Sequence, residues 1–163
     1  MKSGFPELKG EPGWSEVWPF PFWEARRSFT GPAGMEEVGM RYFKTAEGAL
    51  VAKIWFGPSA EGAPGRAHGG ALLTVLDEAM GAAAWVAGIP VLTARLETAF
   101  RRGVPLAVEL LAETKLLQTG GRTLRIEGSI TDRAGTLYAQ ANGVFARLTA
   151  GQVKTIFSRV TPA

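Results

Sequence analysis

The sequence predicts an α+β protein in which one antiparallel sheet wraps around one long central helix. Two strand signals come first, one long apolar helical segment follows, and four strand signals joined by short turns complete the chain. A sheet whose concave face covers the helix satisfies this order. With 163 residues, 46% of them hydrophobic, the chain is long enough for one domain with a sizeable core.

An arm rich in aromatic residues and proline precedes the main domain. We expect the arm at residues 1–34, the domain at 35–150 and a C-terminal tail at 151–163. The aromatic residues of the arm are Trp14, Trp18, Phe20, Phe22 and Trp23. Side chains this apolar are expected to be covered. They pack either on the core of the domain itself or, alternatively, as a lid over a pocket or as a subunit contact.

Residues 38–57 predict two strands around a turn at Glu47–Gly48. The second strand alternates two sets of side chains, with Leu50, Ala52, Ile54 and Phe56 on one face and Val51, Lys53 and Trp55 on the other. A loop rich in glycine and proline follows at 57–65. The helix is expected from His68 to Ala87, and because its apolar residues occupy every face, it is expected to be buried nearly all round.

Four strand segments follow the helix. They are Leu92–Phe100, Leu106–Gln118, Arg122–Asp132 and Thr136–Leu148. In the first of these strands, the alternation of residues places Thr93, Arg95 and Glu97 on one face. The third has one apolar face, formed by Leu124, Ile126, Gly128 and Ile130. Glycine-containing turns at 119–121 and 133–135 indicate antiparallel hairpins.

The composition excludes several classes of function. The chain has no cysteine, which rules out a disulfide framework, a thiol nucleophile and thiolate metal sites, and its single histidine, His68, argues against a multi-histidine metal site. A net charge of +3 is too weak to indicate a nucleic-acid-binding protein but suits a polyanionic small molecule. No signal-peptide pattern or membrane-length apolar run is present, so we expect a cytoplasmic protein that does not bind a membrane. We also expect that it uses no cofactor.

The segment from Arg66 to Glu78 carries the strongest chemical signal. A His68–Gly69–Gly70 turn begins a nearly all-apolar helix, and a Gly-Gly start leaves backbone N–H groups free at the helix N-terminus. Asp77 lies among Leu, Val, Ala and Met residues, where an acid is costly unless it is partnered or used. Amides that hold an oxyanion and a carboxylate that activates water, or attacks directly, together suggest acyl chemistry.

This pattern resembles the hotdog-fold acyl-CoA thioesterases of the PaaI-like (phenylacetate-pathway) family. The resemblance rests on Gly62–Gly70, on Asp77 nine positions after His68 and on Leu92–Arg102, and it covers roughly residues 38–149. It implies hydrolysis of an acyl-CoA to the free acid and CoA. It further implies that the Gly69 N–H polarises the thioester carbonyl, that Asp77 is the nucleophile or general base, and that His68 supports the loop.

Two positions depart from the family pattern. Glu61 lies where relatives often have Asn or Gln, and an ionised Glu accepts hydrogen bonds but donates none. Arg102 replaces a Ser or Thr that assists hydrolysis in some relatives. We expect both residues to contact substrate, together with Gly70, Thr74 and Arg122. Arg122 is the best candidate for CoA phosphates because Arg presents a fork of donors, whereas Thr74 is expected to bond mainly to its own backbone.

Helix geometry predicts a site shared between subunits. Gly69 and Asp77 are eight residues apart, which is about 12 Å along a helix. One thioester carbonyl cannot contact both groups of the same chain, because each contact needs about 3 Å. Two antiparallel helices would bring Gly69 of one chain to Asp77 of a second copy. The resemblance implies the same, because hotdog thioesterases place their sites at a dimer interface, often within tetramers, so we expect a homodimer or a homotetramer.

Two other functions remain open alternatives, and the acyl group is undetermined. A hotdog-type hydratase is disfavoured because the Asp-x-Asn-Pro-x-x-x-His pattern is missing. A non-catalytic acyl-CoA sensor would need no acid, so Asp77 argues against it. Aryl-CoA and short- or medium-chain acyl-CoA all fit the sequence. The length of the pocket is expected to depend on Trp55, Trp85 and the aromatic residues of the arm.

Overall fold

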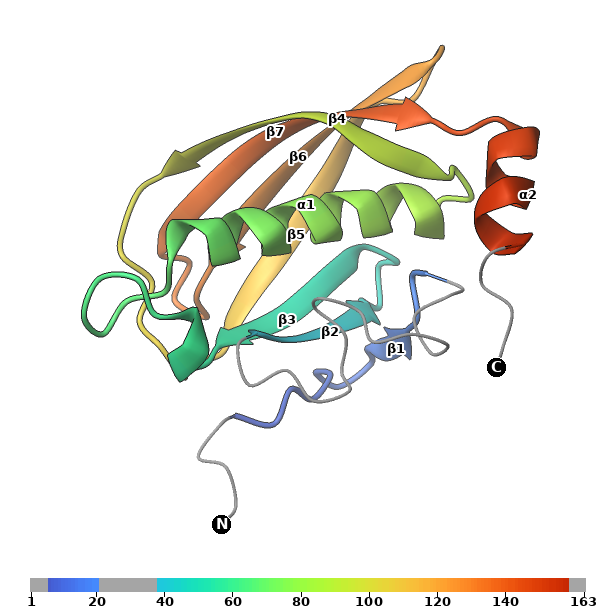
Figure 1. The fold of residues 1–163 in the computed structure, drawn as a ribbon. Helices are drawn as coiled ribbons and strands as arrows, with labels where there is room; N and C mark the ends of the chain where they lie inside the picture. The colour runs from blue at the N-terminus through green and yellow to red at the C-terminus, as the bar shows by residue number, and fades with distance from the viewer. Residues whose placement is uncertain (1–5, 21–37, 159–163) are drawn as a thin grey trace.

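A seven-stranded antiparallel sheet curves around one long helix in the computed structural model, which describes residues 6–20 and 38–158 (Figure 1). This confirms the predicted α+β fold. The strands are β1 (Ser15–Val17), β2 (Val38–Lys44), β3 (Leu50–Phe56), β4 (Val91–Phe100), β5 (Leu110–Gln118), β6 (Thr123–Thr131) and β7 (Leu137–Arg147). The helices are the central α1 (Gly69–Val86), the short α2 (Ala150–Ser158) and a 3-10 turn at Pro58–Ala60.

The strand order β1-β2-β3-β5-β6-β7-β4 places β4 at one edge of the sheet. The chain therefore crosses the concave face as α1 and returns along the far edge. No helix within the described residues is long and apolar enough to span a bilayer.

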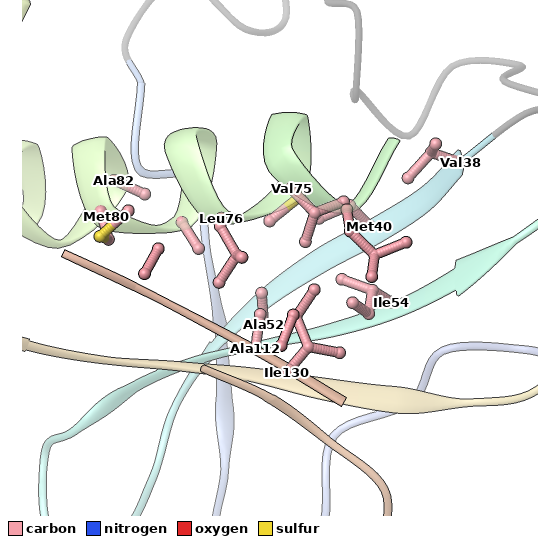
Figure 2. Packing of buried hydrophobic residues seen from close by; sticks show 14 of the residues in the cluster. Val38, Met40, Ala52, Ile54, Val75, Leu76, Met80, Ala82, Ala112 and Ile130 are labelled. Carbon is pink, nitrogen blue, oxygen red and sulfur yellow. The ribbon is translucent and has the colours of Figure 1, made fainter. Parts of the chain in front are cut away.

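The core lies between α1 and the concave face of the sheet. Figure 2 shows Val75, Leu76 and Met80 of α1 beside side chains from several strands, and all three are fully buried. The predicted inner face of β6 is confirmed, because Leu124, Ile126 and Ile130 are at most 1% exposed. The apolar side chains on one face of α1 therefore pack against the side chains that alternate toward the inner face of each strand.

Glycine in the sheet lets α1 approach closely. A Cβ added at Gly143 on β7 would overlap the ring of Phe145 and lie 3.3 Å from the sulfur of Met80 on α1. Both of these neighbours are fully buried and have little room to move. The absence of a side chain at Gly143 thus fixes the depth at which α1 sits.

The helix is not buried all round, contrary to the sequence expectation. Leu73 is 38% exposed, and Thr74, Asp77, Glu78 and Gly81 are only half-buried. These residues form the stripe of α1 that the sheet leaves partly uncovered, although Asp77 on this stripe still reaches Thr93 of β4. The sheet can cover only one side of the helix, and the small apolar residues that suggested complete burial do not require it.

A bulge in β4 also overturns the predicted alternation of that strand. The register with β7 shifts between Thr93 and Arg95, so that Thr93 pairs with the inward-facing Phe145 whereas Arg95 pairs with Val144. One extra residue in a strand moves the following side chains to the opposite faces. Thr93, although exposed, therefore lies on the side of β4 that faces α1, whereas Arg95 and Glu97 lie on the opposite face.

Residues 6–14 of the arm pack on the outer face of the sheet, and the chain then joins the sheet as β1. The expected covering of Trp18 is wrong, because this side chain is 48% exposed. Leu8 is buried, and the Trp14 ring lies 6.1 Å from that of Phe43. Lys53 is 2% exposed although it points outward, and its Nζ lies 2.5 Å from Glu11 of the arm and 3.2 Å from Glu109. The expected covering of Phe22 and Trp23 concerns positions outside the described residues.

Three segments differ from the expectation by more than one residue at an end: the arm contains β1, one strand begins later, and the C-terminal tail contains a helix. The strand predicted from Leu106 begins at Leu110, because Ala107 takes a left-handed backbone conformation with φ 55°. The segment expected to be a C-terminal tail contains α2, which begins with reciprocal hydrogen bonds between Thr149 and Gln152. In Figure 1, α2 stands beside the C-terminal end of α1.

We predict that Gly143→Ala lowers the free energy of unfolding by about 1–3 kcal/mol, because the new methyl group overpacks the core beneath Met80. Gly120→Ala is the matched control, since nothing lies within 4 Å of a Cβ added there, and it is expected to change stability by less than about 0.5 kcal/mol. Chemical denaturation measures both. Equal effects of the two variants would contradict the close seating of α1 on β7.

We also predict a pH-dependent attachment of the arm. The hydrogen bond from Lys53 holds the pKa of Glu11 below its usual value of 4.5. Because the folded pKa is lowered, this carboxylate stabilises the fold above pH 4.5 and loses that contribution as the pH falls through the lowered pKa. Glu11→Gln should therefore lower the melting temperature at about pH 7, with the difference from the unsubstituted protein closing as the pH falls below 4.5 and through the lowered pKa.

Glu7→Gln provides the control for this experiment. Glu7 belongs to the same arm but pairs with Lys9 at a site where both side chains are more than 70% exposed, and such surface pairs contribute little. A Glu7 variant that follows the same pH curve as the Glu11 variant would refute a specific role for the Lys53 pair.

Candidate functional site

The N-terminus of α1 presents one backbone amide without a partner. His68 is the N-cap residue: its Nδ1 accepts a hydrogen bond from the Gly70 N–H at 2.9 Å, and its carbonyl oxygen accepts one from Ala71 at 2.9 Å. Among the described residues, no hydrogen bond is formed by the Gly69 N–H. The side-chain cap thus occupies the Gly70 amide and leaves the Gly69 amide at the positive end of the helix dipole.

The loop before α1 is folded tightly against His68. The Gly65 N–H donates to Oε1 of Glu61 at 2.6 Å, and the Gly62 N–H donates to the carbonyl of Arg66 at 2.8 Å. A Cβ at Gly62 would lie 2.8 Å from the Cα of His68, so this close approach requires glycine. Glu61 is exposed and holds the turn of this loop through its carboxylate.

Asp77 is held by a residue that sequence reasoning missed. The hydroxyl of Thr93 on β4 donates to Oδ1 of Asp77 at 2.6 Å, which is a short, charge-assisted hydrogen bond. Thr93 reaches α1 because of the bulge in β4. Regular alternation grouped Thr93 with Arg95 and Glu97 on one face of the strand. The bulge at Ala94 separates Thr93 from them, and nothing in the sequence indicated this bulge.

The carboxylates of α1 also influence a tyrosine beneath them. Burial raises the pKa of Tyr42 well above its usual value, and the charges of Glu78 and Asp77 raise it further. Both carboxylates therefore act on the same side of the core. Only Asp77 receives the Thr93 hydroxyl.

The expected hydrogen bond between the Thr74 side chain and the helix backbone is confirmed. Its hydroxyl donates to the carbonyl oxygen of Gly70 at 2.9 Å. It lies one helical turn before Asp77 on the exposed stripe of α1. Its hydroxyl is therefore already engaged within the helix.

The two predicted arginines lie at opposite ends of the sheet. The Arg102 N–H donates to the carbonyl of Tyr138, and the neighbouring Phe100 ring lies 3.5 Å from a Cβ built on Gly69. Arg102 is thus near the Gly69 end of α1. The carbonyl of Arg122 instead accepts from Arg147, which pairs with Val91 at the start of β4, near the Asp77–Thr93 pair.

A further arginine, absent from the sequence-based candidates, joins Arg102. Desolvation raises the pKa of Tyr138, a hydrogen bond to Asp132 adds to this, and the charges of Arg102 and Arg66 oppose it. Arg66 also lies against Gly103, with its Cδ 3.0 Å from a Cβ built there. Arg66 and Arg102 therefore form a basic pair beside the N-terminal end of α1. Within the described residues, no three His, Asp or Glu side chains are grouped closely enough to hold a metal ion.

Curated relatives of this chain carry the names of thioesterases. It is 37% identical over 123 residues to the acyl-coenzyme A thioesterase THEM4 of Bos taurus, a match covering 75% of this chain and 50% of that protein. It is 31% identical over 126 residues to the acyl-coenzyme A thioesterase THEM5 of Mus musculus, covering 75% of this chain and 51% of that protein. The chain thus spans about half the length of the curated relatives it matches.

Solved structures share the fold. A thioesterase superfamily protein aligns with a TM-score of 0.67 at 26% identity, covering 77% of this chain and 67% of that one. A hypothetical thioesterase from Streptococcus pneumoniae, solved with coenzyme A, aligns with a TM-score of 0.61 at 20% identity, covering 69% of this chain and 90% of that one. These neighbours have the hotdog fold, as expected here from the resemblance.

The family model of the Thioesterase superfamily matches residues 64–149. The match begins in the loop before α1, includes Gly69 and Asp77, and ends after β7. It therefore contains the whole helix and the four strands that follow it. The chain belongs to the Thioesterase superfamily.

Proposed function

We propose that this chain hydrolyses acyl-CoA thioesters to a free acid and CoA. The observation that carries the proposal is the pairing, on one helix, of a Gly69 amide without a partner and an Asp77 carboxylate oriented by Thr93. An oxyanion donor and a base are the two groups that hydrolysis of an acyl group requires. The names of the curated relatives support this activity, and one solved neighbour was crystallised with acetyl-CoA.

We infer that the working site lies between two copies of the chain. Gly69 and Asp77 of one chain are about 12 Å apart along α1, so a carbonyl at Gly69 needs Asp77 of the partner subunit. Leu73 lies midway between them and is 38% exposed. An antiparallel pair of α1 helices with its two-fold axis near Leu73 would cover this apolar side chain and create two equivalent sites.

The edge of the sheet supports the same arrangement. Among the strands of residues 6–20 and 38–158, β4 has a neighbour on one side only, and its exposed residues include Leu92 at 57% and Phe100 at 54%. A strand of ten residues with one unpaired edge is suited to pairing with another strand. Pairing of two β4 strands around the axis near Leu73 would extend the sheet across the dimer.

The proposed reaction begins with the thioester carbonyl at the N-terminus of α1. Asp77 of the partner subunit removes a proton from a water molecule, whose oxygen attacks the carbonyl carbon. The Gly69 N–H and the helix dipole stabilise the negative charge that develops on the carbonyl oxygen. The C–S bond then breaks, the electron pair leaves with the sulfur of CoA, and the proton returns from Asp77 to the products.

Direct attack by Asp77 is the second route that this geometry allows. The carboxylate would then form an anhydride with the acyl group, which water hydrolyses in a second step. Single turnover in ¹⁸O-water identifies direct attack when water opens the anhydride at the Asp77 carbonyl, because the acid product then carries an oxygen of Asp77 and the label remains in Asp77. In either route Thr93 is a positioning residue, since it orients Asp77 without touching the substrate.

The basic residues suit the phosphates of CoA from both subunits. Arg66 and Arg102 lie at the Gly69 end of one chain, and Arg122 lies at the Asp77 end. The antiparallel arrangement would bring these two groups to the same site. We therefore include Arg66 with Arg102 and Arg122 as candidates for phosphate binding.

We predict that Asp77→Asn lowers kcat for thiol release from acyl-CoA by about 10²–10⁴-fold while acyl-CoA binding survives, because an amide keeps the shape but cannot accept the proton. Thr93→Val should lower kcat by about tenfold or more, since a hydrogen bond to a charged group is lost. Glu113→Gln is the control: this exposed carboxylate lies on β5. Unchanged turnover in Asp77→Asn would rule out its role, and binding without turnover in every variant and in the unsubstituted protein would favour a sensor.

We predict that Gly69→Pro lowers kcat by about 10²–10³-fold because it removes the N–H donor. Proline is tolerated at the first helical position, and the His68 ψ of 138° suits a residue before proline. Gly69→Ala is the matched control, because it keeps the N–H and its Cβ would make an ordinary contact at 3.5 Å with Phe100. A similar loss in both variants would indicate a steric effect instead.

Mixing the two inactive variants tests the shared site. If Gly69 acts with Asp77 of the partner subunit, a mixed dimer of Gly69→Pro and Asp77→Asn contains one intact site. Random co-assembly should then recover about a quarter of the original activity, since half of the dimers are mixed and each has one working site. If both groups act within one chain, mixing should recover none.

A further inference from the structure

A cavity of about 260 Å³ runs along α1 from Asp77 toward the C-terminal end of the helix. Asp77, Gly81 and Trp85 are four residues apart and line it from one face of α1. Side chains from the sheet form the opposite wall: Val91, Leu92, Thr93 and Phe145. A Cβ built on Gly81 has only Phe145 nearby, at 4.0 Å, so the cavity has room for a side chain at this point.

The two terminal segments of the chain contribute side chains to the lining of this cavity near Trp85. Phe20 of the arm and Ile156 of α2 both line it. The Trp85 ring meets Phe20 edge-on at 6.2 Å and meets Phe157 edge-on at 6.3 Å. Aromatic pairs in this geometry stabilise one another beyond their burial. The end wall is therefore a packed aromatic cluster around Trp85.

Phe20 and Ile156 belong to segments of the chain that lie outside the region matched by the family model. The family match covers residues 64–149, which excludes Phe20 and Ile156. Phe20 follows the buried Pro19 and the strand β1, which pairs with β2. α2 is fixed at its start, because the Leu148 N–H donates to the carbonyl of Pro90 at 2.9 Å. Membership of the family therefore does not supply this wall.

We propose that Phe20 and Ile156 set the largest acyl group that this chain accepts, and that the accepted groups are compact. This inference rests on the proposed thioesterase function, which brings the carbonyl beside Asp77 of the subunit that holds this cavity. The cavity beside Asp77 then gives the acyl group a path along α1 toward Trp85. The cavity is smaller than the roughly 300–1,000 Å³ of pockets that hold drug-sized ligands. A long chain would have to displace the aromatic cluster, whereas a short chain ends before it.

Trp55 has no part in this wall, contrary to the sequence expectation. It points to the outer face of the sheet, where its ring covers Gly39 of the neighbouring strand. Trp85 and Phe20 of the arm, by contrast, line the cavity, as expected for residues on which the length of the pocket depends. Acyl length is thus set at the C-terminal end of α1.

The test compares three substitutions that change the cavity in opposite directions. Ile156→Ala and Phe20→Ala remove part of the end wall, whereas Gly81→Ala adds a methyl group to the floor and also favours the helix. Values of kcat/KM are measured for butanoyl-, octanoyl-, dodecanoyl- and hexadecanoyl-CoA. One methylene group in an apolar pocket changes kcat/KM by about 10- to 200-fold. We therefore expect the ratio of dodecanoyl to butanoyl to rise at least tenfold in the first two variants, and the ratio of octanoyl to butanoyl to fall about tenfold in Gly81→Ala.

Val153→Ala is the matched control on α2, because Val153 is half-buried on the same helix but does not line the cavity. Circular dichroism and melting temperature establish that each variant is folded. Two results would overturn the inference: equal kcat/KM of the unsubstituted protein for hexadecanoyl and butanoyl, or the same shift in Val153→Ala as in Ile156→Ala.

A binding measurement separates this inference from the proposed function. S-alkyl-CoA thioethers of the same chain lengths cannot be hydrolysed, and calorimetry gives their Kd in every variant. If the unsubstituted protein releases no thiol, the proposed hydrolysis fails, but a Kd that weakens with chain length and recovers in Ile156→Ala still supports the wall. A Kd that is independent of chain length in all variants refutes the wall, whatever the activity.

Discussion

The fixed rise of a single helix is the constraint on which the proposed site depends. α1 carries the Gly69 amide at its first residue and the Asp77 carboxylate eight residues later, about 12 Å away. No side-chain rotation closes this distance, because the amide belongs to the backbone. Any reaction that needs both groups must therefore use two helices, and the half-exposed stripe of α1 between them is the surface on which a second helix would lie.

The sheet fixes the position of that helix and orients its carboxylate. Gly143 leaves room for Met80, so α1 sits deep against β7. At the edge of the sheet, the bulge in β4 turns Thr93 inward to donate to Asp77. The same strand has an unpaired outer edge and exposes Leu92 and Phe100. β4 thus links the orientation of the carboxylate to the surface on which the proposed dimer would form.

The sequence was sufficient for the parts of the fold that follow from regular periodicity. The order of the elements from β2 to β7, the apolar face of β6 and the apolar helix with its Gly-Gly start are readable from spacing alone, whereas β1 and α2 were not expected. Thr93 was not predictable, because a bulge leaves no mark in a composition that alternates smoothly on either side of it. Arg66 was missed for a similar reason: its proximity to Arg102 comes from the path of two loops, which periodicity does not describe.

The exposed stripe of α1 was also unpredictable, for a different physical reason. Small apolar residues on every face are compatible with burial by the sheet, by a second subunit or by the terminal segments of the same chain. The structure divides the helix between these possibilities: the sheet covers one side, and Phe20 and Phe157 cover Trp85 at the C-terminal end. The stripe around Leu73 remains exposed in the single chain. Because the two regions lie at different points along one helix, changes in the terminal segments can alter the cavity proposed for the acyl group without disturbing the surface proposed for the dimer.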